Sequence, residues 1–262
     1  MKQELNFNIP KYILHESTSR EFLLLEHEKE EIEIKGNYKE VTLKNINSKE
    51  INILIKENSN VVITILVSNN INEFNININS LTNSNYELYL GDISSTNSKI
   101  NINSSLNEIN SKGEIYVSSL GINDNKKEYN INFIHNNKFT FSKSIFKGVA
   151  KDNSLLNVNE TSHIKENNIK SEAYQNIKIT LLDNTSKGIG HPILKIDNND
   201  IKASHGCAIG NIKESDLYYI LSRGIKLEDA KRLLILGNLI TITSKMDEES
   251  KNEFIKYIGE KL

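Results

Sequence analysis

One cysteine, two prolines and no tryptophan occur among the 262 residues of this chain. The single cysteine, Cys207, excludes an intrachain disulfide framework of the kind that small secreted proteins use. No apolar run approaches the roughly 20 residues that span a bilayer, and residues 1–6 contain no apolar core of a signal peptide. We therefore expect a cytoplasmic protein with no membrane segment.

Several common catalytic motifs are also missing. No Gly-x-x-x-x-Gly-Lys-Ser/Thr loop occurs, and the nearest glycine-rich piece, residues 187–192, lacks its spacing and its following helix. The chain contains no His-Glu-x-x-His, paired-cysteine or Gly-x-Ser-x-Gly motif. We expect that this chain binds no nucleotide and is not an enzyme.

The charge balance gives no sign of a nucleic-acid partner. Basic and acidic residues number 32 and 34, without a long basic block. Asparagine, lysine and isoleucine are abundant, as expected of an AT-rich gene, so the polar bias is not evidence of a binding surface. With 37% apolar residues, the chain can bury a sizeable core.

Apolar residues alternate with polar ones from about Glu31 to Ala203, which predicts an all-β body. Examples are Ile51, Ile53 and Ile55; Ile63, Ile65 and Val67; Phe74, Ile76 and Ile78; and Tyr129, Ile131 and Phe133. Many short strands suit a sandwich, a barrel or a parallel β-helix. Connections such as residues 56–60 resemble the corners of a coil and favour the β-helix.

The period changes after Ile212, where residues 214–223, 227–236 and 247–262 each fit a helix. Gly224 can end the first helix in a left-handed conformation, and Asp247 can cap the third. We expect three parts: residues 1–30, which fit a strand or a short helix equally, a β-helix core over residues 31–212, and a helical module over residues 213–262.

Two linked motifs carry a family resemblance. Residues 197–210 read DNNDIKASHGCAIG, and residues 217–225 read LYYILSRGI. They resemble the DDVxxSHGAxxG and LFYxxSRGI patterns of the SufB/SufD core. The similarity extends to Phe146, Lys147, Gly148, Val149, Gln175, Leu181, Leu182, Pro192, Leu194, Ile196, Ala230 and Gly237.

The resemblance implies a right-handed parallel β-helix followed by a helical C-terminal domain. It implies a scaffold for iron-sulfur cluster assembly, carrying a transient cluster. It also implies that two such subunits pair through the β core, as a homodimer or a SufB/SufD-like heterodimer. By the same resemblance we expect residues after Ile212 to dock on the ABC-type ATPase SufC, with Leu236, Ile240 and Ile242 as candidate contacts unless they fold back onto the β body. The chain mostly lacks the N-terminal helical region of full-length relatives.

His205 and Cys207 are the candidate metal ligands. On a strand, positions i and i+2 share a face, so the two side chains form a half-site. Imidazole and thiolate suit iron-sulfur chemistry, but a cluster normally needs four ligands, so a partner must contribute. For an arbitrary protein, both residues would more often be packed core residues.

The motif also departs from the SufB pattern. SufB-type members carry a cysteine directly after the Leu-Phe-Tyr triplet, where this chain has Ile220. Glu249 lies at the distance of an acidic residue near the SufB assembly site, although it can equally be a helix-start charge. A SufD-like supporting subunit that holds no cluster is therefore an alternative.

Two alternatives belong to other functional classes. A β-helix polysaccharide lyase or hydrolase would need clustered carboxylates, for which Asp197, Asp200 and Glu160 are candidates without a diagnostic spacing. A purely structural β-helix would use His205 and Cys207 as core residues.

Overall fold

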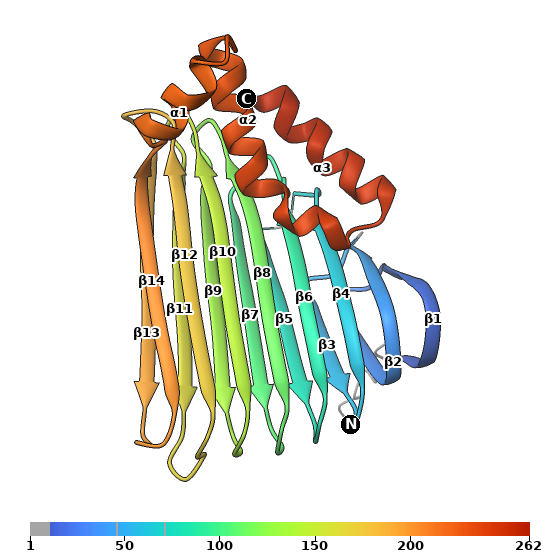
Figure 1. Cartoon of the computed structure of the whole chain (residues 1–262). Helices are drawn as coiled ribbons and strands as arrows, with labels where there is room; N and C mark the ends of the chain where they lie inside the picture. The colour runs from blue at the N-terminus through green and yellow to red at the C-terminus, as the bar shows by residue number, and fades with distance from the viewer. Residues whose placement is uncertain (1–10, 46, 71) are drawn as a thin grey trace, which may run out of the picture.

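A computed structural model describes residues 11–45, 47–70 and 72–262 (Figure 1). The strands are β1 (Lys11–Leu25), β2 (Lys29–Asn45), β3 (Glu50–Ile55), β4 (Asn60–Val67), β5 (Glu73–Ser80), β6 (Asn85–Asp92), β7 (Ser98–Leu106), β8 (Lys112–Gly121), β9 (Lys126–His135), β10 (Phe141–Ala150), β11 (Leu155–Ile164), β12 (Glu172–Leu181), β13 (Lys187–Ile196) and β14 (Lys202–Asn211). The helices are α1 (Glu214–Leu221), α2 (Leu227–Leu239), the 3-10 helix η1 (Ile240–Lys245) and α3 (Glu248–Lys261).

The strands stack in parallel into two facing sheets. Odd-numbered strands from β3 to β13 form one face, and even-numbered strands from β4 to β14 form the other (Figure 1). Strand β2 joins the faces because its first half pairs with β3 and its second half with β4. The coil is a flattened parallel β-helix with six two-strand turns after β2, which confirms the predicted fold class. Residues 11–25, whose pattern fitted strand and helix equally, form β1, which pairs with β2.

The interior is built from columns of stacked side chains. Alternate residues of each strand point between the two faces, and the parallel register places Ile51 beside Ile76, Ile76 beside Ile102, and Ile102 beside Ile131. All four are buried. Each such side chain contributes roughly 1.5–3 kcal/mol on burial, so these columns are a main source of stability.

The outer surface of the odd-numbered face carries asparagine ladders. One row contains Asn52, Asn77, Asn103 and Asn132, and a second contains Asn75, Asn101, Asn130 and Asn159. In each row an amide donates to the carbonyl oxygen of the preceding amide at 2.8–3.0 Å. Asn58, Asn83 and Asn110 occupy equivalent corners with φ of 57°, 55° and 60°. The abundant asparagine therefore has a structural use in this fold.

The C-terminal helices cover part of the even-numbered face (Figure 1). Outward-facing Tyr89 and Val149 belong to the same buried cluster as Leu239 and Phe254. The hydroxyl of Ser118 donates to the carbonyl oxygen of Leu239 at 3.1 Å. One side of the helical module is therefore tied to the β-helix by an apolar core of its own.

This packing corrects one boundary of the helical prediction and decides between the two alternatives left open for Ile242. Helix α2 continues beyond Leu236 to Leu239, because Leu239 is fully buried against the β-helix. Ile242 is also buried and folds back onto the β body, so it is not available for docking, whereas Ile240 is partly exposed.

The expected helix ends are present. Gly224 follows α1 with φ of 82°, and the Asp247 side chain accepts a hydrogen bond from the backbone N–H of Ser250 at 3.1 Å. No helix of the described residues is long and apolar enough to cross a membrane.

The corner geometry predicts the effect of substituting Asn110. Asn110→Val should lower the free energy of unfolding by roughly 1–2 kcal/mol more than Asn110→Gly, because a β-branched residue resists positive φ. Both variants lose the hydrogen bond to Asn83, so their difference isolates the backbone effect. Urea unfolding measures it, and equal stabilities would contradict this account.

Candidate functional site

Strand β14 brings His205 and Cys207 to the last turn of the coil. His205 pairs with Gln175 and Cys207 with Ile177 in the parallel register. Gln175 and Ile177 are both buried in the interior. His205 and Cys207 therefore share the inward-facing side of β14, as their i, i+2 spacing predicts.

Gly190 of β13 makes room for the thiol. A Cβ atom at this position would lie 2.6 Å from Cys207 Sγ, so only glycine allows the thiol to rest against this strand. Burial, with the negative charge of Glu160 as a second cause, raises the pKa of Cys207. The thiol is therefore mostly protonated at neutral pH, and a metal would have to displace its proton.

The interior columns change from aliphatic to polar near the last turn. The column Ile51, Ile76, Ile102, Ile131 on the odd-numbered face continues with Glu160. On the even-numbered face the column runs Ile63, Leu88, Ile115, Ser144, Gln175, His205. Polar side chains thus occupy interior positions that earlier turns fill with isoleucine and leucine.

Glu160 is the most unusual of these interior residues. It is fully buried, and burial raises its pKa to about 7. The hydroxyl of Ser144 donates to its Oε2 at 2.8 Å, while its Oε1 has no hydrogen-bond partner. A carboxyl group that can be protonated or ionised near neutral pH therefore lies inside the coil, one turn before the last and beside Pro192 of β13.

The last turn is uncovered. Strands β13 and β14 are the two ends of the sheet, and neither contains a buried residue. Ile189, Ile193 and Ile209 are 38%, 44% and 40% exposed there. Unpaired strand edges and exposed isoleucines are features of a surface that another protein covers.

The described residues contain no preformed metal site. Within residues 11–45, 47–70 and 72–262, no three His, Cys, Asp or Glu side chains converge closely enough to hold a metal. Glu249 lies at the start of α3, where its carboxylate pairs with Lys44 of β2. The structure therefore brings His205 and Cys207 together but leaves Glu249 near the other end of the coil.

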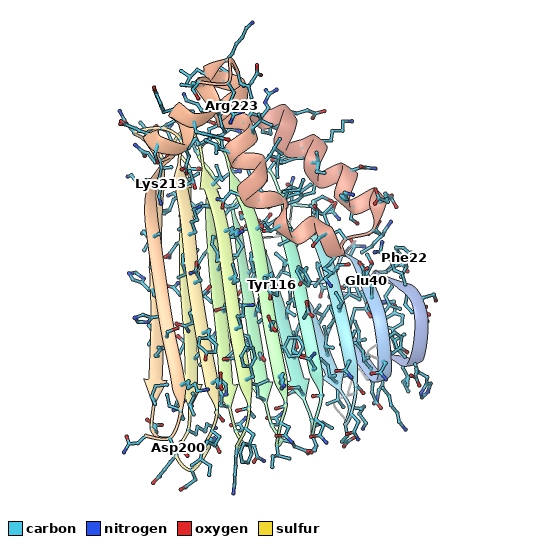
Figure 2. The ribbon with its side chains drawn as sticks, in the orientation of Figure 1. Phe22, Glu40, Tyr116, Asp200, Lys213 and Arg223 are labelled. Carbon is cyan, nitrogen blue, oxygen red and sulfur yellow. The ribbon has the colours of Figure 1, made fainter. Side chains whose placement is uncertain are left out.

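The carboxylates considered for carbohydrate chemistry do not share a groove. Asp197 pairs with His163 at 2.7 Å, and Asp200 pairs with Lys170 at 2.9 Å. Figure 2 shows Asp200 in the loop between β13 and β14, at the ends of the strands opposite the helices. Glu160 is inside the coil, so the three acids cannot act on one sugar.

The outer side of the helical module presents a second exposed surface. Helix α1 contains no buried residue, and Tyr218 and Tyr219 are 75% and 60% exposed. Leu233 of α2 is half exposed. Arg223 stacks on the Tyr219 ring at 5.1 Å and lies at the tip of the module (Figure 2). A groove of about 460 Å³ separates β14 from α2.

These features define a class: a parallel β-helix with a thiol and an imidazole at its open end and a helical module on one face. The family model "SUF system FeS cluster assembly, SufBD core domain" matches residues 15–238. The chain belongs to this SufB/SufD family, whose members take part in iron-sulfur cluster assembly.

Three relatives give the extent of the similarity. The chain is 28% identical to iron-sulfur cluster assembly protein SufD of Bacillus subtilis over 151 residues, covering 57% of this chain and 35% of that protein. It is 27% identical to SufD of Escherichia coli over 129 residues, covering 49% of this chain and 30% of that protein. The SufBD family protein ycf24 of Galdieria sulphuraria is 28% identical over 153 residues, covering 58% of this chain and 69% of ycf24. The matched part therefore spans about a third of the two SufD proteins.

Sequence reasoning missed the inner part of this site. From the sequence, Glu160 is a candidate only for carbohydrate chemistry, and Gly190 belongs only to a glycine-rich piece that lacks the spacing of a phosphate-binding loop. A signal was present, because Val158, Glu160 and Ser162 alternate on one face of a predicted strand, which puts a carboxylate among core positions. The parallel register was needed to place that carboxylate beside Pro192 of the last-turn strand β13.

Burial of Glu160 predicts a pH-dependent stability. The pKa of Glu160 is about 7 in the folded chain and 4.5 ordinarily, so folding favours the protonated carboxyl group. The contribution of this group to the free energy of unfolding is therefore present below pH 4.5, and about 3 kcal/mol is lost as the pH rises through about 7. Glu160→Gln should flatten this part of the stability profile in urea unfolding between pH 4.5 and 8. The exposed Glu166→Gln is the control, and equal profiles for both variants would contradict the prediction.

Proposed function

We propose that this chain is a cytoplasmic, non-catalytic scaffold subunit that assembles an iron-sulfur cluster together with a SufC-like ABC-type ATPase. The single observation that carries the proposal is the placement of Cys207 and His205 on one face at the uncovered end of the β-helix. The cluster is the cargo of the protein. ATP is bound and hydrolysed by the partner.

Pairing of two chains supplies the ligands that one chain lacks. A thiolate and an imidazole from each of two subunits make four soft or borderline donors, the number that a cluster normally needs. In a heterodimer, a SufB-like partner would add its own cysteine. The free edges of β13 and β14, with exposed Ile189 and Ile193, support pairing through this end of the coil.

The helical module supplies the contact with the ATPase. Its inner side is already used against the β-helix, whereas Tyr218, Tyr219 and Leu233 are exposed on α1 and α2. Aromatic and aliphatic side chains of this kind are typical anchors of protein interfaces. Docking through residues after Ile212 would couple ATP-driven movement of the partner to the pairing of the two β-helices.

A second role within the same family is a SufD-like supporting subunit that does not ligate the cluster. Ile220 at the position of the SufB cysteine favours it, as does the raised pKa of Cys207. The two roles differ in whether assembly depends on the Cys207 thiol.

Anaerobic reconstitution with ferrous iron and sulfide tests the ligand assignment. The wild-type chain should develop the sulfide-to-iron charge-transfer absorbance, and Cys207→Ser should lose most of it because serine is a much poorer ligand for a cluster. Ser204→Ala, on the opposite side of β14, is the control. Full charge-transfer absorbance from the Cys207→Ser chain would favour the SufD-like supporting role, in which the thiol is not a cluster ligand.

Light scattering after size-exclusion chromatography tests the docking surface. Leu233→Ser should weaken the complex with the cognate ATPase by tenfold or more, because an exposed apolar anchor is lost. Ile13→Ser is a matched control, since Ile13 is 52% and Leu233 50% exposed, but Ile13 lies on β1 at the other end of the coil. Equal binding by both variants would place the contact elsewhere.

A further inference from the structure

The inner wall of the open end contains two buried oxygen atoms without hydrogen-bond partners. They are Oε1 of Glu160, which is fully buried, and Oε1 of Gln175, which is 4% exposed. The other polar atoms of both side chains are used: Ser144 donates to Glu160 Oε2, and Gln175 Nε2 donates to Ser162 at 3.0 Å and to the carbonyl oxygen of Ile193 at 3.2 Å.

Leaving such oxygens unpaired is costly. A buried acceptor without a partner destabilises a protein by roughly 1–3 kcal/mol. At the equivalent interior positions one turn earlier, the chain has Ile131 on one face and Ser144 on the other. The fold thus accommodates small or apolar side chains in these columns, so two unsatisfied acceptors within the one turn formed by β11 and β12 point to a ligand.

Both oxygens belong to the same region as His205 and Cys207. Gln175 is the direct strand neighbour of His205. Glu160 accepts a hydrogen bond from Ser144, the strand neighbour of Gln175, and lies beside Pro192 of the last turn. The His205 ring makes no hydrogen bond within the described part of the chain, and the Cys207 thiol donates a long hydrogen bond of 3.9 Å to the carbonyl oxygen of Gly190. Both His205 and Cys207 are exposed on an edge strand, so their side chains have room to turn.

The donor set selects the chemistry of the ligand. A carboxylate, an amide oxygen, an imidazole and a thiolate are all electron-pair donors, so a cation would satisfy them, whereas an anion would not. Mixed oxygen, nitrogen and sulfur donors suit a divalent transition metal such as ferrous iron better than the oxygen-only preferences of magnesium or calcium. The carboxylate and the thiolate together would neutralise the charge of one such ion.

We propose that Glu160, assisted by Gln175, is the inner oxygen ligand of a divalent transition-metal site whose outer ligands are Cys207 and His205 of the same chain. This inference rests on the proposed function and adds to it an entry site for iron in each subunit. Since no preformed group of three such side chains exists among the described residues, the outer ligands turn inward when the ion binds, and water completes its coordination.

Cobalt(II) titration of the chain of residues 1–262 under anaerobic conditions tests the site, because the visible spectrum of Co²⁺ reports both coordination and thiolate bonding. The wild-type chain should bind Co²⁺ with a thiolate-to-cobalt band. Glu160→Gln, which keeps the side-chain shape, should raise the Kd at least tenfold, and Glu166→Gln should leave it unchanged. Circular dichroism confirms that each variant is folded.

Unchanged cobalt affinity in the Glu160→Gln chain, with the thiolate band retained, would overturn the inner ligand and leave the proposed function standing. A Kd for Co²⁺ at least tenfold higher in the Glu160→Gln chain, together with a thiolate-to-cobalt band in the wild-type chain, would support the site. If this dependence on Glu160 held but the wild-type chain formed no cluster with iron and sulfide, the metal site would stand and the scaffold function would fall.

Discussion

The parallel backbone ladder between successive turns is the interaction on which the rest of this structure depends. Each strand bonds to the strand one turn earlier and one turn later, so a given position always lies beside its equivalents. Isoleucine therefore stacks on isoleucine inside the coil, and asparagine on asparagine outside it. One side-chain type repeated along a column is stabilised by its own copies, as in other stacked β structures.

The same ladder explains why the site lies at the end of the coil. A ladder must stop, and at β13 and β14 it stops with unpaired edges and without buried side chains. Interior positions of this last turn are reachable from outside, unlike those of earlier turns. Polar residues such as Glu160 and Gln175 occupy the columns just below it, where their chemistry can act on groups at the opening.

The helical module shows how one segment can serve two surfaces. Its inner residues, among them Leu239 and Phe254, extend the apolar packing over the even-numbered face. Its residues on α1 are not buried. Ile242 looked as suitable for docking as Ile240 in the sequence, because helical periodicity gives the relative direction of side chains and not the side on which the β-helix lies.

The amino-acid sequence by itself determined the all-β body, the helical end, the helix caps and the likeness of residues 197–225 to the SufB/SufD core, because alternation, capping residues and motifs are local properties. It also placed His205 and Cys207 on one face. Only the tertiary structure decided that Glu160 and Gln175 lie in the turn just before that pair and that Glu249 does not. Those relations depend on which strands stack in which register, and residues 29 or 30 positions apart become strand neighbours only when the coil closes.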